Sequence, residues 1–248
     1  MGRAISLELA KRGCTVCAVY RSDKESAEIL EGELKKINAE SCTLCGDVSS
    51  QETANQIVEQ VAELWGRVDI LVNNAGIFDF CYIEDMTEAY LDRILSINFK
   101  SQFFMMKAVI PHMKKAGGGR IVNASSISGH FADCGLVGYG ASKASVDMLT
   151  KIGAGELGPY HITVNAYAPG IIHTDMTHEM ICERGDEQVQ DMCLGRFGTP
   201  EDAAALVGFL TSEEAGYLTG EIIGVDGGMF KVQNAYLAYK RAESLNQK

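Results

Sequence analysis

The 248-residue chain has no apolar run long enough to cross a bilayer, and its start lacks the charged-then-apolar order of a secretory signal. Basic residues are in the minority: 22 Lys and Arg face 33 Asp and Glu, and the net charge is −11. This balance disfavours nucleic acid and anionic membranes as partners, because both are negatively charged. The 46% apolar content favours a soluble globular chain with a large core.

Eight cysteines occur without a secretory signal, which predicts reduced thiols and a cytoplasmic location. Cys14-Thr-Val-Cys17 and Cys42-Thr-Leu-Cys45 together have the spacing of a four-thiolate zinc site. Both segments are nevertheless typical of β-strands, on which residues three apart face opposite sides of the sheet. We therefore expect small buried strand residues and no metal site.

Strand-like and helix-like segments alternate from Cys14 onward. Helices are expected from Ser22, where Ser22 and Glu25 form a capping box, over 52–65, 88–115 and 139–158, and within an excursion over 169–213. Apolar strands are expected over 15–20, 41–48, 69–74, 120–125, 162–167 and 221–226. This order predicts one α/β domain with a doubly wound, Rossmann-like parallel sheet in three α/β/α layers.

The chain opens directly on a helix, MGRAISLELAKRG, which ends at Gly13. A doubly wound nucleotide fold begins with a strand, a glycine-rich turn and a helix, so we expect the first strand to be absent. About 15 residues would precede Gly2, which would be the final glycine of that turn. Translation then starts upstream, or the chain is a non-catalytic fragment or binding protein without the main pyrophosphate-binding amides.

Three residues near the middle of the chain are candidates for a catalytic site. Tyr139 and Lys143 lie four apart at the start of a helix, so both side chains emerge on one face. Ser126 ends a strand, at the sheet edge where open α/β folds bind ligands. A Ser followed by Y-x-x-x-K resembles the signature of the short-chain dehydrogenase/reductase family.

The resemblance extends over nearly the whole chain. Further motifs in the family's order are NNAG at 73–76, SINF at 96–99, PGIIHT at 169–174, GRFGTPEDAA at 195–204 and LTGEIIGVDGG at 218–228. Only the TGxxxGxG turn does not match. The resemblance implies an NAD(P)-binding domain over 1–229, followed by a C-terminal extension over 230–248.

The resemblance also implies roles in the interconversion of a ketone and a secondary alcohol. Tyr139 exchanges the proton, Lys143 holds the nicotinamide ribose, Ser126 binds the substrate oxygen, and Asn98 helps position a relay water. A Lys143 ammonium about 4 Å from the phenol would lower its pKa by up to about three units. In the alternative interpretation, Ser126 is an ordinary hydroxyl at the end of a strand, and Asn98 forms hydrogen bonds to the backbone at an irregular turn of a helix. Asn73 is expected to have a structural role of this kind.

Arg21 indicates the cofactor. It lies 19 residues after Gly2, where an acidic residue would bind a ribose 2′-hydroxyl and an arginine accommodates a 2′-phosphate. This favours NADP(H) over NAD(H); Asp23 argues the other way, but the helix dipole explains it. By resemblance, the cofactor residues are Gly2, Arg21, Ser22, Asp47, Val48, Asn74, Ala75, Gly76, Tyr139, Lys143, Pro169, Gly170, Ile172 and Thr174.

Flexible apolar residues over 175–198 favour a small hydrophobic carbonyl or alcohol substrate, although helix packing explains them equally well. TDMT, GRFGTPED and VDGGM resemble the 3-oxoacyl-[acyl-carrier-protein] reductases, which implies a carrier-bound substrate. GPYH before ITVN lacks their basic residue, so a hydroxysteroid or other alicyclic-alcohol dehydrogenase is the alternative. The family is commonly tetrameric or dimeric, which implies a homotetramer or homodimer. A short helix containing Tyr236, Leu237 and Tyr239 packs on a neighbouring subunit or is a loose tail.

Overall fold

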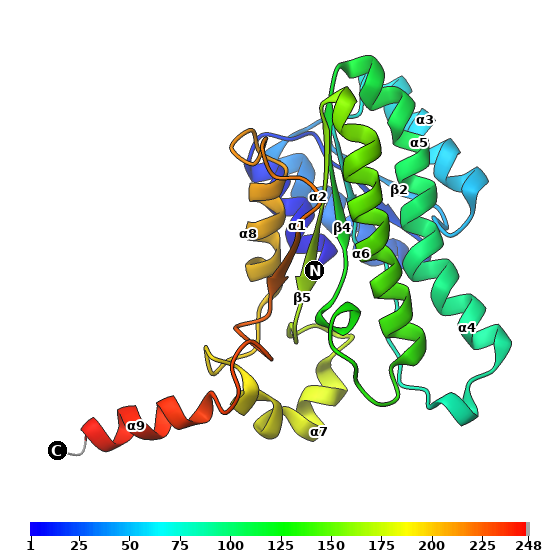
Figure 1. Ribbon diagram of the computed structural model, residues 1–248. Coiled ribbons are helices and arrows are strands. Elements are labelled where there is room, and N and C mark those ends of the chain that lie inside the picture. The colour runs from blue at the N-terminus through cyan, green and yellow to red at the C-terminus, as the bar shows by residue number, and fades with distance from the viewer. Residues whose placement is uncertain (247–248) are drawn as a thin grey trace.

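The computed structural model describes residues 1–246 (Figure 1). The helices are α1 (Gly2–Lys11), α2 (Lys24–Ile37), α3 (Gln51–Trp65), α4 (Glu88–Leu95), α5 (Ser101–Ala116), α6 (Val137–Leu157), α7 (His178–Gln188), α8 (Pro200–Leu210) and α9 (Tyr236–Asn246). The strands are β1 (Cys17–Tyr20), β2 (Cys42–Cys45), β3 (Ile70–Asn73), β4 (Gly119–Ala124), β5 (Ile162–Pro169) and β6 (Ile222–Val225). The predicted order of elements is confirmed.

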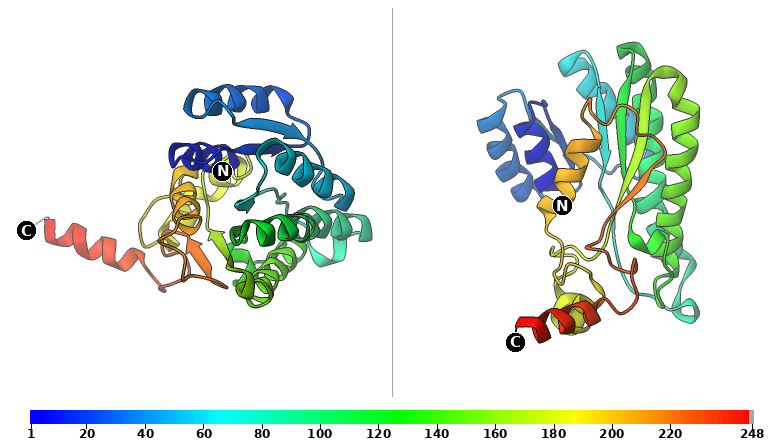
Figure 2. Two further views of the ribbon diagram at one scale, coloured as in Figure 1. Left: turned by 90° about the horizontal axis from the view of Figure 1, so that it is seen from above. Right: turned by 60° about the vertical axis from the view of Figure 1, so that its left-hand side comes forward.

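The larger sheet is parallel, with strand order β3-β4-β5-β6, and helices cover both of its faces (Figures 1 and 2). Successive residues of a strand point to opposite faces. Ile121 of β4 accordingly packs in a core cluster with α3 and α5, whereas Val122 packs in a second cluster with α1 and α8. The predicted doubly wound, three-layer architecture is confirmed.

The sheet is divided into two parts. β1 pairs with β2, and β3 pairs with β4, but β1 and β3 are not paired with each other within residues 1–246. Between them lies a cavity of about 1010 Å³, whose apolar lining includes Ile5, Leu9, Val16, Ala18, Leu71 and Val109. The first element of the described residues is α1, which begins at Gly2.

The start of α2 differs from the prediction. Asp23 is its N-cap and accepts a hydrogen bond from the Ser26 amide at 3.0 Å, so the capping box of Ser22 and Glu25 is wrong. Aspartate and serine are comparably good caps, and here the carboxylate one residue further on is the side chain that reaches a free amide. Asp23 is therefore a capping residue, which supports the structural explanation of its presence beside Arg21.

The cysteine-containing segments adopt strand structure only in part, and the expected full burial is wrong, because Cys14, Cys17 and Cys42 are partly exposed and Cys45 is exposed. Cys14 lies before β1, whereas Cys17 and Cys42 are register partners on β1 and β2. All eight thiols are free, and burial raises the pKa of Cys14, Cys17 and Cys42. Residues 1–246 contain no cluster of three or more His, Cys, Asp or Glu that could hold a metal ion.

The expected C-terminal helix is present as α9, which projects from the body of the molecule (Figure 1, red). Tyr239 anchors it by donating a hydrogen bond from its hydroxyl to the carbonyl of Cys193 at 2.8 Å. Residues 247–248 of the predicted extension lie outside the described residues. Throughout residues 1–246, no helix combines the length and apolar character needed to cross a membrane.

Candidate active site

Ser126, Tyr139 and Lys143 meet at the carboxyl end of β4. Tyr139 and Lys143 lie on the first turns of α6, and Ser126 follows β4 by two residues. Lys143 is 4% exposed, and its Nζ lies 5.6 Å from the centre of the Tyr139 ring. Burial raises the pKa of Tyr139 and the Ser126 side chain opposes that rise, which places Ser126 beside the phenol. The structure thus brings together three of the four predicted catalytic residues; the fourth is Asn98.

The electrostatics of Tyr139 differ from the expectation. Burial raises the pKa of Tyr139, and the Ser126 hydrogen bond opposes that rise only in part. The expected lowering by Lys143 is wrong for this structure, because Lys143 Nζ donates to the carbonyl of Ala124 at 2.8 Å instead. A raised pKa keeps the phenol protonated at neutral pH. Tyr139 is therefore in the form that donates a proton to a carbonyl oxygen.

Asn98 lies in a π-helical turn, Ser96–Lys100, and is fully buried. Its Oδ1 accepts from the Ile77 amide at 2.8 Å, and its Nδ2 donates to the Ile77 carbonyl at 3.0 Å. The interpretation that Asn98 bonds backbone at a helix irregularity is confirmed. These bonds fix Gly76, where an added Cβ would lie 3.3 Å from Asn98 Oδ1 and 3.6 Å from Lys143 Nζ. The water-positioning role of Asn98 stays a prediction.

Asn73 has the structural role expected of it, since its Nδ2 donates to Asn123 Oδ1 at 2.9 Å inside the sheet. Gln102 was not predicted. This buried glutamine donates from Nε2 to the carbonyls of Asn98 at 3.0 Å and Ala124 at 3.1 Å. Its sequence signal is a lone amide four residues after Asn98 on an otherwise apolar helix face. Gln102 and Lys143 therefore share one acceptor at the end of β4.

Eight of the predicted cofactor residues line the cavity beside β1 and β3: Gly2, Arg21, Ser22, Asp47, Val48, Asn74, Ala75 and Gly76. A Cβ on Gly2 would lie 2.8 Å from Asn74 Nδ2, so a larger residue here would have to displace the Asn74 side chain. Hydrogen bonds from Ser49 lower the pKa of Asp47, and the nearby charge of Arg21 adds to that effect. The positive charge and small residues follow the carboxyl ends of β1, β2 and β3, and this end of the cavity fits a nicotinamide dinucleotide.

Comparisons with known proteins agree with this geometry. A family model described as enoyl-(acyl carrier protein) reductase matches residues 1–230. The 3-oxoacyl-[acyl-carrier-protein] reductase FabG of Thermotoga maritima is 38% identical over 229 residues, covering 92% of this chain and 93% of that protein. The protein of the same name from Staphylococcus epidermidis is 38% identical over 230 residues, covering 93% and 94%. A solved Serratia marcescens short-chain dehydrogenase/reductase variant has a TM-score of 0.86 at 33% identity, covering 92% of each chain.

The chain belongs to the short-chain dehydrogenase/reductase family. This is a family of oxidoreductases acting on CH–OH groups. Both the motif order along the chain and the meeting of Ser126, Tyr139 and Lys143 agree with that membership.

Two further predicted cofactor residues of this short-chain dehydrogenase/reductase, Tyr139 and Lys143, lie on α6, and the last four lie at the end of β5 rather than on the cavity. Pro169 ends β5, and a Cβ on Gly170 would lie 2.9 Å from the Asp226 backbone. The other two, Ile172 and Thr174, are held by Thr177, whose Oγ1 donates to the Ile172 carbonyl and accepts from the Thr174 amide. Since β4 and β5 are parallel neighbours, these residues share the sheet edge with Ser126.

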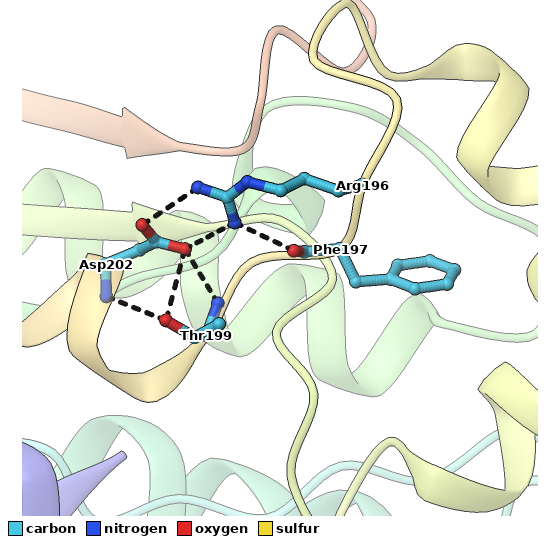
Figure 3. A network of polar contacts seen from close by, with 4 residues as sticks. All are labelled: Arg196, Phe197, Thr199 and Asp202. Atoms are coloured by element: carbon cyan, nitrogen blue, oxygen red, sulfur yellow. Dashed lines mark hydrogen bonds and ion pairs between the residues drawn. The ribbon is translucent and has the colours of Figure 1, made fainter.

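A polar network that was not predicted lies beside the segment 169–174, on residues 196–202 (Figure 3). Arg196 donates to both carboxylate oxygens of Asp202, at 2.7 and 3.1 Å. Asp202 and Thr199 form a reciprocal capping box at the start of α8. The hydrogen bonds from Arg196 are the main cause of the low pKa of Asp202, which is about 2. The adjoining Gly198 bridges to Ile172. The T-x-x-D spacing was the sequence signal for this cap.

The surroundings of Tyr139 are aromatic and apolar. Phe78 meets the Tyr139 ring edge-on with centroids 5.0 Å apart. Of the apolar residues expected to cover the substrate, Met192 is buried in a cluster with Met180 and Ile181, so helix packing explains these three. Met176, in contrast, is 49% exposed and lines a hollow of about 420 Å³ together with Phe78.

Proposed function

We propose that this chain interconverts a ketone and a secondary alcohol with a nicotinamide dinucleotide, with Tyr139 exchanging the proton. The observation that carries the proposal is the position of Tyr139 beside the buried Lys143, with Ser126 at the adjoining end of β4. The bound dinucleotide supplies the hydride. Ser126 orients the carbonyl oxygen, the protonated phenol of Tyr139 donates to it, and Lys143 holds the ribose. Asn98 helps position the water through which Tyr139 regains a proton.

The proposed cofactor is NADP(H) rather than NAD(H). Arg21 is exposed and lines the cavity, and the Asp23 carboxylate two residues later is engaged at the cap of α2. A guanidinium forms charge-assisted, often bidentate hydrogen bonds with phosphate, which suits a ribose 2′-phosphate. The other residues that would hold the adenosine half are Ser22, Asp47 and Val48.

The proposed substrate is a 3-oxoacyl thioester, with an acyl-carrier-protein-bound chain as the physiological form. Support comes from the two relatives named as 3-oxoacyl-[acyl-carrier-protein] reductases. A specific observation favours the alternative, a hydroxysteroid or other alicyclic alcohol: Phe78 places an aromatic edge directly against Tyr139. An aromatic wall suits a compact hydrophobic ring.

A substrate panel tests these proposals. The chain is incubated with NADPH and either 3-oxobutyryl-N-acetylcysteamine, a carrier-free thioester, or the bicyclic ketone trans-1-decalone, and nicotinamide absorbance is followed. Faster turnover of the thioester supports the reductase proposal, and faster turnover of decalone supports the alicyclic alternative. No oxidation of NADPH with either compound, together with no thermal stabilisation by NADPH, would refute the enzymatic proposal in favour of a non-catalytic protein.

We also propose that the chain works in the cytoplasm as a homotetramer or homodimer. Apolar side chains on α5 and α6 support self-association, since Phe103 is 42% exposed, Met148 57% and Ile152 52%. Light scattering of the purified chain tests the oligomeric state. A monomer at micromolar concentration would contradict this part of the proposal.

A further inference from the structure

Asp147 lies one helical turn after Lys143 on α6 and is only 6% exposed. A buried carboxylate is costly unless it is hydrogen-bonded or paired. Its Oδ1 accepts a hydrogen bond from Ser125 Oγ at 2.5 Å, and its Oδ2 lies 3.3 Å from His130 Nε2. The carboxylate therefore connects α6 to both ends of the segment 125–130.

The 3₁₀ turn Ile127–Gly129, inside this segment, packs tightly against α6. A Cβ on Gly129 would lie 2.9 Å from Asp147 Oδ2 and 3.1 Å from the carbonyl carbon of Lys143. Ser126 is the N-cap of the same turn and accepts from the Ser128 amide at 3.2 Å. A displacement of the Asp147 carboxylate would consequently move Ser126 relative to α6.

We propose that Asp147 is a positioning residue, which holds Ser126 in register with Tyr139 through Ser125 and the Ile127–Gly129 turn. For its catalytic part, this inference rests on the proposed carbonyl reductase function. The contact is non-local, because Ser125 and Asp147 are separated by 22 residues. It fixes the distance between the residue that binds the substrate oxygen and the residue that donates the proton.

Asp147 also acts on Lys143 through its charge. Burial raises the pKa of Asp147, whereas the Ser125 hydrogen bond and the charges of His130, Lys151 and Lys143 lower it. Burial lowers the pKa of Lys143 to about 8, and the negative charge of Asp147 opposes that shift. Without this charge, the pKa of Lys143 falls further, so the ammonium loses its proton at a lower pH.

Amide hydrogen exchange, measured by mass spectrometry on the full chain, tests the positioning. Asp147→Ala and Ser125→Ala each remove one side of the contact, and Glu156→Gln is the control because it alters an exposed carboxylate on the same helix. Exchange over 125–130 is expected to rise about tenfold in both Ala variants and to stay unchanged in the control. Unchanged exchange in Ser125→Ala, which keeps the buried charge, overturns the positioning role.

A pH profile of activity distinguishes the effect of the Asp147 charge on Lys143 from the effect of the Ser125–Asp147 hydrogen bond. Asp147→Asn keeps the shape and an acceptor oxygen, so the alkaline limb of kcat/KM for reduction is expected to move to lower pH by about half a unit to one unit. Ser125→Ala is expected to lower kcat without moving that limb. An unmoved limb in Asp147→Asn overturns the charge role. If the unmodified chain reduces no carbonyl compound, the proposed function fails, and the exchange result still decides the positioning.

Discussion

Lys143 donates its hydrogen bond to the carbonyl oxygen of Ala124, at 2.8 Å, and not to Tyr139. Ala124 is the last residue of β4 and stands two residues before Ser126. The ammonium is therefore fixed to the strand end that leads to the Ser126 hydroxyl. Since burial lowers the pKa of Lys143 to about 8, this anchored charge titrates just above neutrality. The geometry of the site is thus set by one backbone oxygen that Lys143 shares with Gln102.

Tyr139→Phe is expected to lower kcat for carbonyl reduction by about 10²–10⁴-fold, because the proton donor is lost while the ring remains. The affinity for NADPH should change much less than kcat, since Tyr139 is one of many predicted cofactor residues and those lining the cavity are unchanged. Steady-state turnover and a thermal-shift titration with NADPH measure the two effects. Tyr217→Phe is the matched control, because that side chain is fully exposed. Undiminished turnover of Tyr139→Phe contradicts the assigned role.

The coenzyme preference is predicted to depend on Arg21. The unmodified chain should prefer NADPH to NADH by about tenfold or more in kcat/KM, since one charge-assisted phosphate contact contributes about 1.5–3 kcal/mol. Arg21→Ala should remove most of this preference by weakening NADPH alone. Lys24→Ala changes a neighbouring exposed cation and should leave the preference intact. Comparable use of both coenzymes by the unmodified chain would contradict the proposed preference for NADP(H).

Local patterns in the sequence were sufficient for the order of the elements and for the meeting of Ser126, Tyr139 and Lys143. The reason is that the strands end at one edge of a parallel sheet and that the i, i+4 spacing is fixed by the helix. The capping box at Ser22 failed because neighbouring residues compete for the same amides, and only the path of the chain decides between them.

Properties that depend on contacts between distant parts of the chain could not be predicted from the sequence. The pKa of Tyr139 depends on how deeply the ring is buried, and the fold determines that burial. Ser125 and Asp147 are joined across 22 residues, and neither local spacing nor the family motif indicates their contact. Gln102 is a helix residue whose role depends on two carbonyls from other turns and strands.

Asp202 is predicted to stabilise the fold through its charge. Its pKa of about 2 lies below the ordinary 3.8, so the stabilisation is present above about pH 4 and is lost as the pH falls toward 2. The shift corresponds to about 2.4 kcal/mol, which solvent screening at this partly exposed pair reduces to about 1 kcal/mol. Asp202→Asn should therefore lower Tm by about 2–4 °C at pH 7.

The acid dependence distinguishes this pair from a general surface effect. The Tm difference between Asp202→Asn and the unmodified chain should shrink as the pH falls from about 4 toward 2. Glu201→Gln removes the neighbouring carboxylate on the same helical turn, which lacks the Arg196 contact, and should change Tm less. A pH-independent difference would show that shape, and not charge, is responsible.

The cavity between β1 and β3 is predicted to accept one extended strand. β1 and β3 border this cavity and are not paired with each other within residues 1–246, so each presents an edge to which a parallel strand can pair. Six Val- and Ile-rich residues and a glycine-rich turn, joined ahead of Met1, should enter it, because parallel strands buried on both faces are continuously apolar. A net gain of about 2 kcal/mol would raise Tm by about 4–8 °C. An extension of equal length made of Gly and Ser is the control, and equal melting of the two chains would contradict the prediction.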